Sequence, residues 1–393
     1  MKLKCIPEDF QVEELTSVAP DQGSFALYRL VKESMGTPEA IAAVISRFNL
    51  HRRQVSYGGL KDKHARTLQY LTIHRGPRRS ISQTSLSLEY LGQTNRAYTS
   101  ADINGNRFTV VLRDMKPDAT EFAQRAVQDI AQCGLPNYFD DQRFGSLGES
   151  GEWIGKSWCL GDYERALWLA LADPVENDSS AEKREKQILR DLWGQWPDCK
   201  RALSRSHRRS VVTFLSDKVE SGREPDCRGA FARISVDLRG LYLSAFQSAL
   251  WNRLLTRCTT ATIPEGALLP FRLLSGPGVF AAGISADQAK ALGELKLPLP
   301  SARIDLPEGE IGRWLSEVLE EEKLELRQIR VKYPRDSFFS RGERTAFVSP
   351  GAIKHDVASD ELYPGRQRMT LEFELPRGSY ATILVKRLTI PNT

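Results

Sequence analysis

The stretch Val55-Ser-Tyr-Gly-Gly-Leu-Lys-Asp-Lys-His-Ala65 carries the features from which the rest of this chain can be interpreted. Gly58 and Gly59 permit a tight turn between two strand-like segments. A single acid, Asp62, follows the turn and has a lysine on either side. Cations so close to a carboxylate favour its charged form. We therefore expect an ionised Asp62 on a turn between two strands.

The wider window from His51 to Arg79 is strongly basic. Against its one acid, Asp62, it has eight cations: Arg52, Arg53, Lys61, Lys63, Arg66, Arg75, Arg78 and Arg79. Such a patch suits contacts to nucleic-acid phosphates, which add affinity without reading the base sequence. The alternative is a solvated basic face with an exposed turn aspartate.

An ionised Asp62 is unexpected on a surface that only binds phosphate, because the two groups repel each other. The residue makes sense if its carboxylate carries out chemistry on a nucleotide. An aspartate that merely closes a turn by hydrogen bonding is common, and the residues alone favour that simpler interpretation.

Composition restricts the class of protein. The 393 residues are 41% hydrophobic and 27% charged with a net charge of +5, which is ordinary for a folded chain of two or three domain-sized units. No apolar run is long enough for a membrane span, and the start of the chain lacks a signal peptide's apolar stretch. The six cysteines form no CxxC pair and the five histidines lack ligand spacing, so we expect neither zinc nor disulfides and a reducing, cytoplasmic location.

Apolar patterning predicts a strand-rich N-terminal third. Two strands are expected within residues 11–30, around the turn Asp21-Gln22-Gly23, and a helix from Thr37 as N-cap to about Phe48. Further strands are expected at residues 54–57, 67–74 and 107–113, and a helix over residues 119–133 that ends at Gly134.

The middle of the chain has a different texture. Helices are predicted over residues 163–172, 180–193, 243–255 and 311–324. After about Ser349 the pattern returns to strands, with residues 370–375 and 381–388 flanking the turn Pro376-Arg377-Gly378-Ser379. This order indicates a mixed-sheet α+β domain that is interrupted by a largely helical insertion and completed by C-terminal strands.

Several segments resemble motifs of the TruD family of pseudouridine synthases, in the order expected of that family. Gly59-Leu-Lys-Asp-Lys-His-Ala65 is similar to its signature, and Leu375-Pro-Arg-Gly-Ser-Tyr-Ala-Thr382 to its C-terminal hairpin. The other matches are Lys4 with Pro7-Glu-Asp-Phe-Gln-Val-Glu13, Asn104-Gly-Asn-Arg-Phe108 and Pro136-Asn-Tyr-Phe-Asp-Asp-Gln-Arg-Phe-Gly145. The resemblance reaches from residue 4 to residue 388 and is thin in the insertion.

The resemblance implies a pseudouridine-synthase core, an α+β fold on a mixed β-sheet, in residues 1–146 and 347–393. It also implies an inserted, largely helical α/β TRUD domain in residues 147–346. The implied activity is isomerisation of a uridine in tRNA, at position 13 in the best-known bacterial members, without cofactor or metal. The expected partner is tRNA; no membrane and no obligate protein partner is implied, and the expected state is a monomer.

The same resemblance implies roles for individual residues. Asp62 matches the catalytic aspartate, which either attacks the ribose anomeric carbon or takes a ribose proton to give a glycal. The matching substrate-binding residues are Phe10, Asn137, Phe139, Tyr380, Lys4 and Lys61. The alternatives are core packing for the two phenylalanines, a turn asparagine, and lysines that hold Asp62 or are solvated on the surface. Tyr380 stands where the family often has phenylalanine, and Asp140 where it often has glycine; Asp140 and Asp141 are expected to be turn or surface residues.

Two other functions stay open from the sequence. One is a catalytically silent RNA-binding protein or tRNA-folding helper of the same architecture, which the intact Asp62, Asn137 and Phe10 disfavour. The other is a glycosidase-like hydrolase, which would usually need two working carboxylates. A second basic cluster in the insertion could hold tRNA or could be a charged helix face: Lys200, Arg201, Arg205, His207, Arg208 and Arg209.

Overall fold

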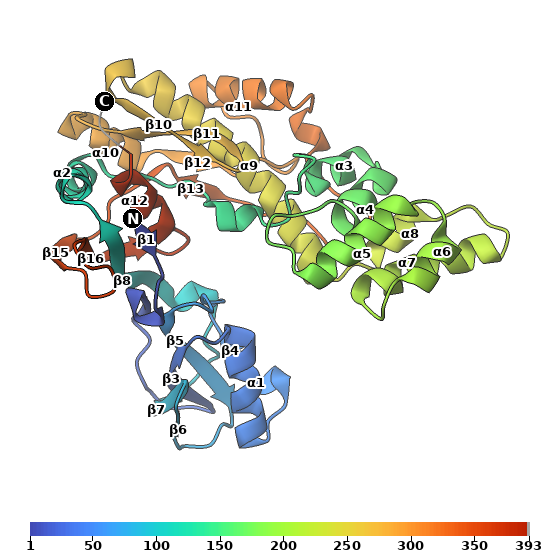
Figure 1. The fold of residues 1–393 in the computed structure, drawn as a ribbon, viewed down its shortest axis with the longest axis horizontal. Coiled ribbons are helices and arrows are strands. Elements are labelled where there is room, and N and C mark those ends of the chain that lie inside the picture. Colours follow the sequence, from blue (N-terminus) through green and yellow to red (C-terminus); the bar gives the residue numbers. More distant parts are fainter. Residues whose placement is uncertain (391–393) are drawn as a thin grey trace. The chain divides into compact units, whose positions relative to one another are not determined.

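The computed structural model describes residues 1–390, and the chain divides into two compact units (Figure 1). Unit 1 comprises residues 1–137, residues 282–293 and the described residues from Phe347 onward. Unit 2 comprises Tyr138–Ala281 and Glu294–Ala346. The expected domain limits of 1–146 with 347–393, and of 147–346, stay a prediction about which parts act as functional domains.

A large mixed sheet forms the centre of unit 1, as expected for an α+β protein. Its main path runs in the order β15-β16-β8-β2-β5-β3-β7-β6, and all neighbours are antiparallel except the parallel pair β2 and β5. The strands are β2 (Phe10–Thr16), β3 (Phe25–Glu33), β5 (Arg66–His74), β6 (Ile81–Gln83), β7 (Leu86–Thr94), β8 (Ile103–Met115), β15 (Lys354–Ser359) and β16 (Gln367–Pro376). Two short strands join at the side, β1 (Lys2–Leu3) on β8 and β4 (Val55–Tyr57) on β5.

The two strands predicted around the Asp21 turn exist, but they are not neighbours in the sheet. β5 lies between β2 and β3, so that Leu68 is paired with Glu13 on one side and with Val31 on the other. This order brings the segment that precedes β5, which includes Asp62, next to the start of β2.

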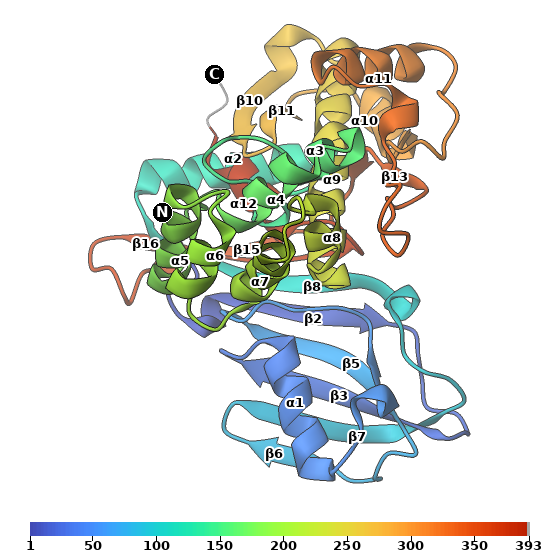
Figure 2. The same ribbon diagram turned by 90° about the vertical axis from the view of Figure 1, so that its right-hand side faces the viewer.

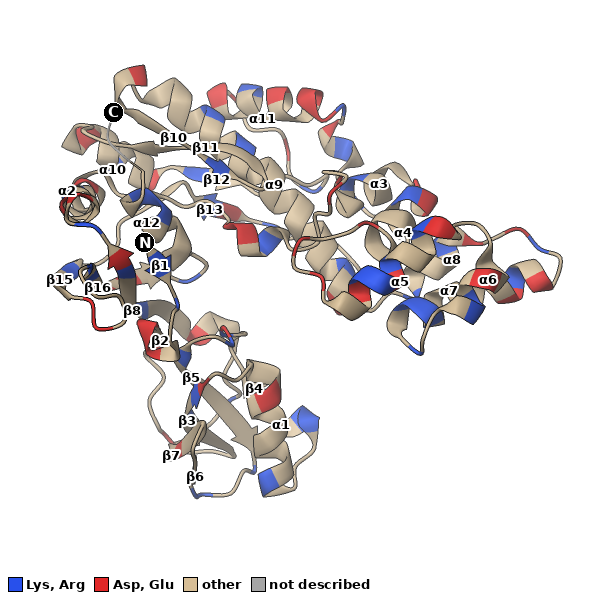
Figure 3. Cartoon of the chain, in the orientation of Figure 1, with Lys and Arg blue, Asp and Glu red and all other residues tan. Residues whose placement is uncertain are grey.

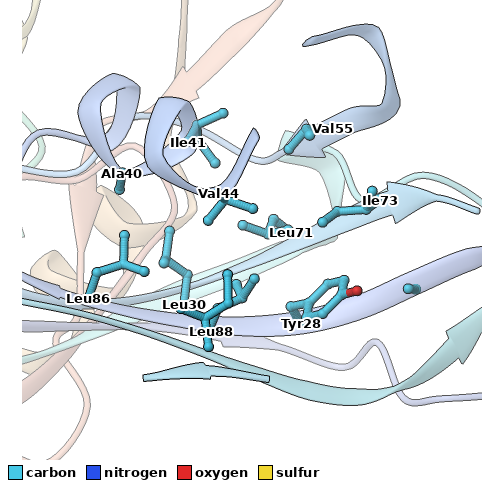
Figure 4. Close-up of a cluster of buried hydrophobic side chains, with 12 residues drawn as sticks. Tyr28, Leu30, Ala40, Ile41, Val44, Val55, Leu71, Ile73, Leu86 and Leu88 are labelled. Atoms are coloured by element: carbon cyan, nitrogen blue, oxygen red, sulfur yellow. The ribbon is translucent and has the colours of Figure 1, made fainter. Parts of the chain in front are cut away.

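Helix α1 (Thr37–Phe48) covers one face of the sheet over β3, β5 and β7 (Figure 2). Its apolar face packs Ala40, Ile41 and Val44 against side chains that alternate along β3 and β5, such as Leu30 and Leu71 (Figure 4). This spacing of three to four residues in the helix and of two in each strand is the pattern that the sequence shows.

The N-terminal boundary of α1 differs from the prediction in a way that matters for the site. Gly36 occupies the N-cap position, and Thr37 is the first helical residue. The Thr37 hydroxyl is fully buried; it donates to Gln69 Oε1 at 2.9 Å and accepts from the backbone N–H of Lys61 at 2.9 Å. Thr37 therefore does not cap its helix with its side chain but binds the loop that carries Asp62.

The predicted strand over residues 381–388 is wrong, and so is the expected C-terminal hairpin. After β16 the chain turns and forms α12 (Ala381–Leu388), which packs against α2 (Pro117–Cys133). The apolar run at its centre, Ile383-Leu-Val385, is short, and the periodicity of so short a run cannot separate a buried strand from a buried helix. The packing of this segment against α2 stabilises the helical form.

The remaining elements of unit 1 are short. β9 (Leu135–Pro136) pairs with β14 (Phe347–Val348), and α10 (Ala286–Glu294) belongs almost entirely to this unit. The predicted helix end at Gly134 is confirmed, because this glycine follows α2 with a φ of +72°.

Unit 2 is mainly helical and is built around the long helix α9 (Val236–Thr262), the yellow helix in Figure 1. Its other helices are α3 (Ile154–Leu160), α4 (Tyr163–Leu171), α5 (Ser180–Asp191), α6 (Trp196–Ala202), α7 (His207–Glu220), α8 (Cys227–Ala232) and α11 (Glu310–Glu321). Two small two-stranded sheets complete it: a hairpin of β10 (Leu268–Leu273) with β11 (Gly276–Ala281), and the antiparallel pair of β12 (Lys296–Pro298) with β13 (Glu343–Thr345). Among residues 1–390, no helix is both long and apolar enough to cross a membrane.

Candidate active site

Asp62 lies in unit 1, in the loop between β4 and β5. Lys4, which follows β1, donates from Nζ to Asp62 Oδ2 at 2.7 Å. The Asp62 side chain is 40% exposed and that of Lys4 27%, so the pair faces solvent without being fully solvated. Within the described chain no donor binds the second oxygen, Oδ1. The site therefore offers one carboxylate oxygen that is fixed and one that is available to a ligand.

Phe10 lies beneath the Lys4 ammonium. Lys4 Nζ is 4.1 Å from the centroid of the Phe10 ring, which is a cation–π distance. The Phe10 ring is only 4% exposed and packs edge-on against Phe108. Lys4 itself has a φ of +57°, a conformation that non-glycine residues adopt at some energetic cost and that is concentrated at functional sites.

The turn that holds Lys4 and Phe10 is anchored by a buried carboxylate. Asp9 accepts from the backbone N–H groups of Cys5 and Ile6 at 3.0 and 3.1 Å. It also accepts from Arg113 Nε of β8 at 2.8 Å, and Arg113 in turn donates to Asp360. These groups are almost fully buried, so the ion-pair network fixes the position of the segment before β2.

Lys32 binds the backbone of the loop that carries Asp62. It is fully buried at the end of β3, and its Nζ donates to the carbonyl oxygens of Met35 (2.7 Å), Asp62 (2.8 Å) and Lys61 (3.4 Å). Burial lowers the pKa of Lys32 to about 8, and the neighbouring Asp62 carboxylate opposes that shift.

Gln69 of β5 completes the support of this loop together with Thr37. Gln69 Nε2 donates to the carbonyl of Gly59 at 3.4 Å, while its Oε1 accepts from Thr37. Both side chains are fully buried. The backbone from Gly59 to Asp62 is therefore bound at several points by buried polar groups of β3, α1 and β5.

Lys61 points away from solvent toward β2 and β8. Its Nζ lies 3.1 Å from Glu14 Oε2 and donates to Asn106 Oδ1 at 2.5 Å, and its side chain is 10% exposed. Glu14 is buried and accepts from the Tyr98 hydroxyl at 2.8 Å. Lys61 thus has strong partners inside the protein, and its predicted contact with substrate stays a prediction.

Two further predicted residues lie in unit 1 outside this first group. Tyr380 is half-buried at the N-terminus of α12, shortly after the last residues of β16, Leu375 and Pro376. Leu375 is paired with Asn106, the residue that Lys61 contacts. Asn137 is buried (7% exposed) immediately after β9.

Phe139 belongs to unit 2. Its backbone exchanges two hydrogen bonds of 2.9 Å with the side-chain amide of Asn252 on α9. Its half-buried ring is edge-on to Trp251 and 4.2 Å from the guanidinium of Arg344. The neighbouring Asp140 precedes a short 3-10 turn, as expected of a turn residue, but it is buried rather than on the surface.

Seven of the eight cations of the basic window separate into two sets in the folded chain; Arg66 belongs to neither, and Arg47, which precedes the window, joins the second set. Lys63 pairs with Glu39 and Lys61 with Glu14, so the lysines near Asp62 have acidic partners. Six exposed arginines at the other end of α1 form what we name the arginine cluster: Arg47, Arg52, Arg53, Arg75, Arg78 and Arg79 (Figure 3). In the part of the chain that the structure describes, none of the six pairs with an acid.

Two contacts and a shared pocket connect the parts of the arginine cluster. Gln54, which follows Arg53, donates to the carbonyl of His74, and the Arg79 guanidinium lies over the Phe48 ring. A pocket of about 440 Å³ is lined by Arg47, Arg79 and their neighbours. Arg47 is ten residues beyond Thr37, which corresponds to about 15 Å along α1. The cluster therefore begins about that far from the loop of Asp62.

Three cations of the second basic cluster, in unit 2, have local acidic partners. Lys200 pairs with Asp217 and Glu220, Arg201 with Asp198, and Arg208 with Glu185. Burial lowers the pKa of His207. These contacts favour a charged helical surface over a dedicated phosphate site.

No group of three potential metal ligands occurs among residues 1–390. The residues that the sequence did not single out are the buried supports of the loop, above all Lys32, Glu14 and Asn106. Lys32 could have been noticed in the sequence. It stands two residues after Leu30 and four after Tyr28, so on a strand its side chain points to the same buried face as theirs. A lysine at a buried strand position indicates a specific partner.

Comparison with known proteins gives one consistent result. The family model described as tRNA pseudouridine synthase D (TruD) matches residues 1–388. "Probable tRNA pseudouridine synthase D 1" of Methanococcus maripaludis is 30% identical over 99% of both chains, and "tRNA pseudouridine synthase D" of Aquifex aeolicus is 26% identical over 99% of this chain and 98% of its own. A crystal structure from Methanosarcina mazei assigned to TruD superposes with a TM-score of 0.74 at 25% identity, covering 99% of this chain and 93% of that one.

Proposed function

Because this chain belongs to the TruD family of tRNA pseudouridine synthases, we propose that Asp62 is the carboxylate with which it isomerises a uridine of tRNA. Enzymes of this family are isomerases that act on tRNA. The uridine at position 13 is the target that we propose for this chain.

The observation that supports Asp62 most directly is the asymmetric environment of its carboxylate. Lys4 holds Oδ2 at 2.7 Å, and Oδ1 has no donor within residues 1–390. The ammonium stabilises the charged carboxylate, and a fixed Oδ2 directs Oδ1 toward solvent, where a uridine taken out of its stack can reach it.

Either of two routes can follow from this geometry. In the first, Oδ1 attacks the ribose anomeric carbon as the bond to uracil nitrogen breaks, and the carboxylate leaves again when the turned uracil attaches through C5. In the second, the carboxylate takes the ribose C2′ proton as the bond to uracil nitrogen breaks, which gives a glycal; the turned uracil then adds through C5 to C1′ while the proton returns to C2′. In both, the C5 proton of uracil is finally lost to solvent.

The other predicted residues would bind and orient the nucleotide. Phe10 forms an apolar floor that holds Lys4 at the carboxylate. Asn137 offers an amide with donors and acceptors for the uracil edge, and Tyr380 and Phe139 offer rings that can form walls for a flipped base.

The arginine cluster is the part of the catalytic unit that we propose to contact the tRNA backbone. Its six guanidinium groups are exposed and lack acidic partners within the described chain, whereas the lysines beside Asp62 are paired. Arginines free of internal ion pairs can neutralise phosphates without losing an existing interaction.

The test is single-turnover release of tritium from unmodified tRNA transcripts labelled at uridine C5, with the product site mapped by carbodiimide-dependent primer extension. We expect the wild type to release the label, and Asp62→Ala to lose the rate by at least about three orders of magnitude with tRNA binding preserved. Asp217→Ala, which removes an exposed aspartate paired with Lys200, is the matched control.

Two results would contradict the proposal. If Asp62→Ala keeps the wild-type rate, Asp62 is not the catalytic carboxylate. If the wild type binds a broad panel of tRNAs and releases no label from any of them, the chain is a silent RNA-binding protein; release of free uracil would instead indicate a hydrolase.

A further inference from the structure

We propose that Lys32 is a positioning residue for the catalytic loop, and that its ammonium, by binding the carbonyls of Met35, Lys61 and Asp62, sets the direction of the Asp62 side chain. The inference rests on the proposed function, because it assumes that Asp62 reacts. It extends that function by assigning a role to a residue that does not touch substrate.

The first argument is the number of donors. A lysine ammonium has three N–H groups, and Lys32 Nζ has three carbonyl oxygens within hydrogen-bond distance. The neutral amine has only two N–H groups and a lone pair, which would face one of these oxygens. The loop is therefore fully bound only while Lys32 is protonated.

The second argument is what the three carbonyls belong to. One is the carbonyl of Asp62 itself, the second is that of the residue before it, and the third belongs to the turn that leads into α1. Burying a charge costs free energy unless the charge is well paired. The fully buried ammonium of Lys32 therefore calls for a structural or functional explanation. Fixing the loop of Asp62 against β3 and α1 supplies one.

The third argument is the charge environment of the ammonium. The charged groups that act on it are Asp62 and Lys61 of the loop and Glu39 of α1. Burial lowers the pKa of Lys32 to about 8, close enough to working pH for the proton to be lost under mild conditions.

The experiment compares Lys32→Met, Lys32→Arg and wild type in single-turnover release of tritium at saturating tRNA, with the tRNA Kd and the Tm measured for each. We expect Lys32→Met to lower the rate about 100-fold with little change in Kd, because a small misplacement of a reacting group costs that much. Lys32→Arg should recover part of the rate. Lys186→Met, which removes a buried lysine paired with Asp178 in unit 2, is the control for losing a buried ammonium.

The pH dependence of the rate distinguishes a positioning role of Lys32 from a purely structural one, because a purely structural role would not change it. Between about pH 7 and 9 the wild-type rate should fall as Lys32 loses its proton, and this fall should be absent in Lys32→Arg, whose guanidinium stays charged. If Lys32→Met does not fold, the comparison of these two profiles decides alone.

Three outcomes overturn the inference: a wild-type rate in Lys32→Met, an equal loss of rate and of tRNA affinity, or the same pH profile in wild type and Lys32→Arg. Failure of the proposed function looks different. There the wild type is inactive, or Asp62→Ala is active, whatever Lys32 does.

Discussion

At the scale of single residues, Lys4 contacts both a carboxylate and an aromatic ring of the proposed site. Lys4 binds Asp62 Oδ2 and lies over the buried Phe10 ring. The Lys4 side chain is 27% exposed and the Asp62 side chain 40%, so solvent reaches both partners of this short ion pair.

Replacing Lys4 by Met should therefore lower the single-turnover rate by about 10- to 100-fold while tRNA binding changes little. The physical reason is that Asp62 loses both a stabilising charge and a fixed orientation. Lys2→Met is a close control, since Lys2 also lies near an aspartate, Asp114, and over an aromatic ring, Tyr363. An equal loss of rate in both variants would argue against a specific role for Lys4.

The lowered pKa of Lys32 also leads to a prediction about the free energy of unfolding. The pKa of Lys32 is lower in the folded chain than in the unfolded chain, so between about pH 8 and 10 the unfolded chain holds more protons. The contribution of Lys32 to the free energy of unfolding therefore rises with pH over that range. The test is denaturant unfolding of wild type and Lys32→Met at several pH values. The free energy of unfolding of the wild type, relative to that of the variant, should increase with pH. A difference that stays constant with pH would contradict the lowered pKa of Lys32.

At the scale of elements, the loop between β4 and β5 has two glycines with different requirements. A Cβ on Gly58 would lie 2.5 Å from Ile103 Cδ1 and 3.2 Å from the carbonyl of Thr99. A Cβ on Gly59 would meet no atom within 4 Å. Close packing thus explains the first glycine and not the second.

Gly58→Ala should accordingly destabilise the protein by about 1–3 kcal/mol, as overpacking usually does, and should disturb the loop of Asp62. Gly59→Ala should change the free energy of unfolding by well under about 1 kcal/mol. Thermal unfolding of the two variants tests this directly, and equal effects would mean that the contact with Ile103 relaxes freely.

The C-terminal element shows where local pattern fails. Residues 381–388 contain the β-branched Thr382, Ile383 and Val385, which favour a strand, yet the segment forms α12 against α2. The helix at residues 37–48 was predictable because its buried residues recur on one face only.

At the scale of the whole molecule, charge is distributed unevenly between local pairs and unpaired groups. Lys200 and Arg201 of unit 2 have acidic partners, whereas the arginine cluster of unit 1 has none within the described residues. Net charge alone does not reveal this difference.

The triple variant Arg47→Gln, Arg78→Gln and Arg79→Gln should weaken tRNA binding at low salt. It should also reduce the slope of log Kd against log salt concentration by about 2 to 3, since each phosphate contact contributes about 0.7–0.9. Arg201, Arg313 and Arg327 changed together to Gln remove the same charge from paired positions. If both triple variants alter the slope equally, only net charge matters and the cluster is not a specific contact.

Most elements of the fold could be predicted from the sequence, because they rest on local patterns, whereas the proposed site stays a prediction. Alternation and helical spacing predict β5, β8, α1 and α2, and a short motif around Asp62 predicts the reactive loop. The order of strands could not be predicted, since the placement of β5 between β2 and β3 depends on pairing across some 50 residues.

What the sequence by itself determined is thus the set of elements, the family and the residue proposed to react. What only the tertiary structure decided is which side chains surround that residue. Lys4 reaches Asp62 across 58 positions, Lys32 across 30, and the Glu14 partner of Lys61 lies on another strand. Such contacts depend on sheet order and side-chain direction, which are cooperative properties of the folded chain and leave no periodic trace in the sequence.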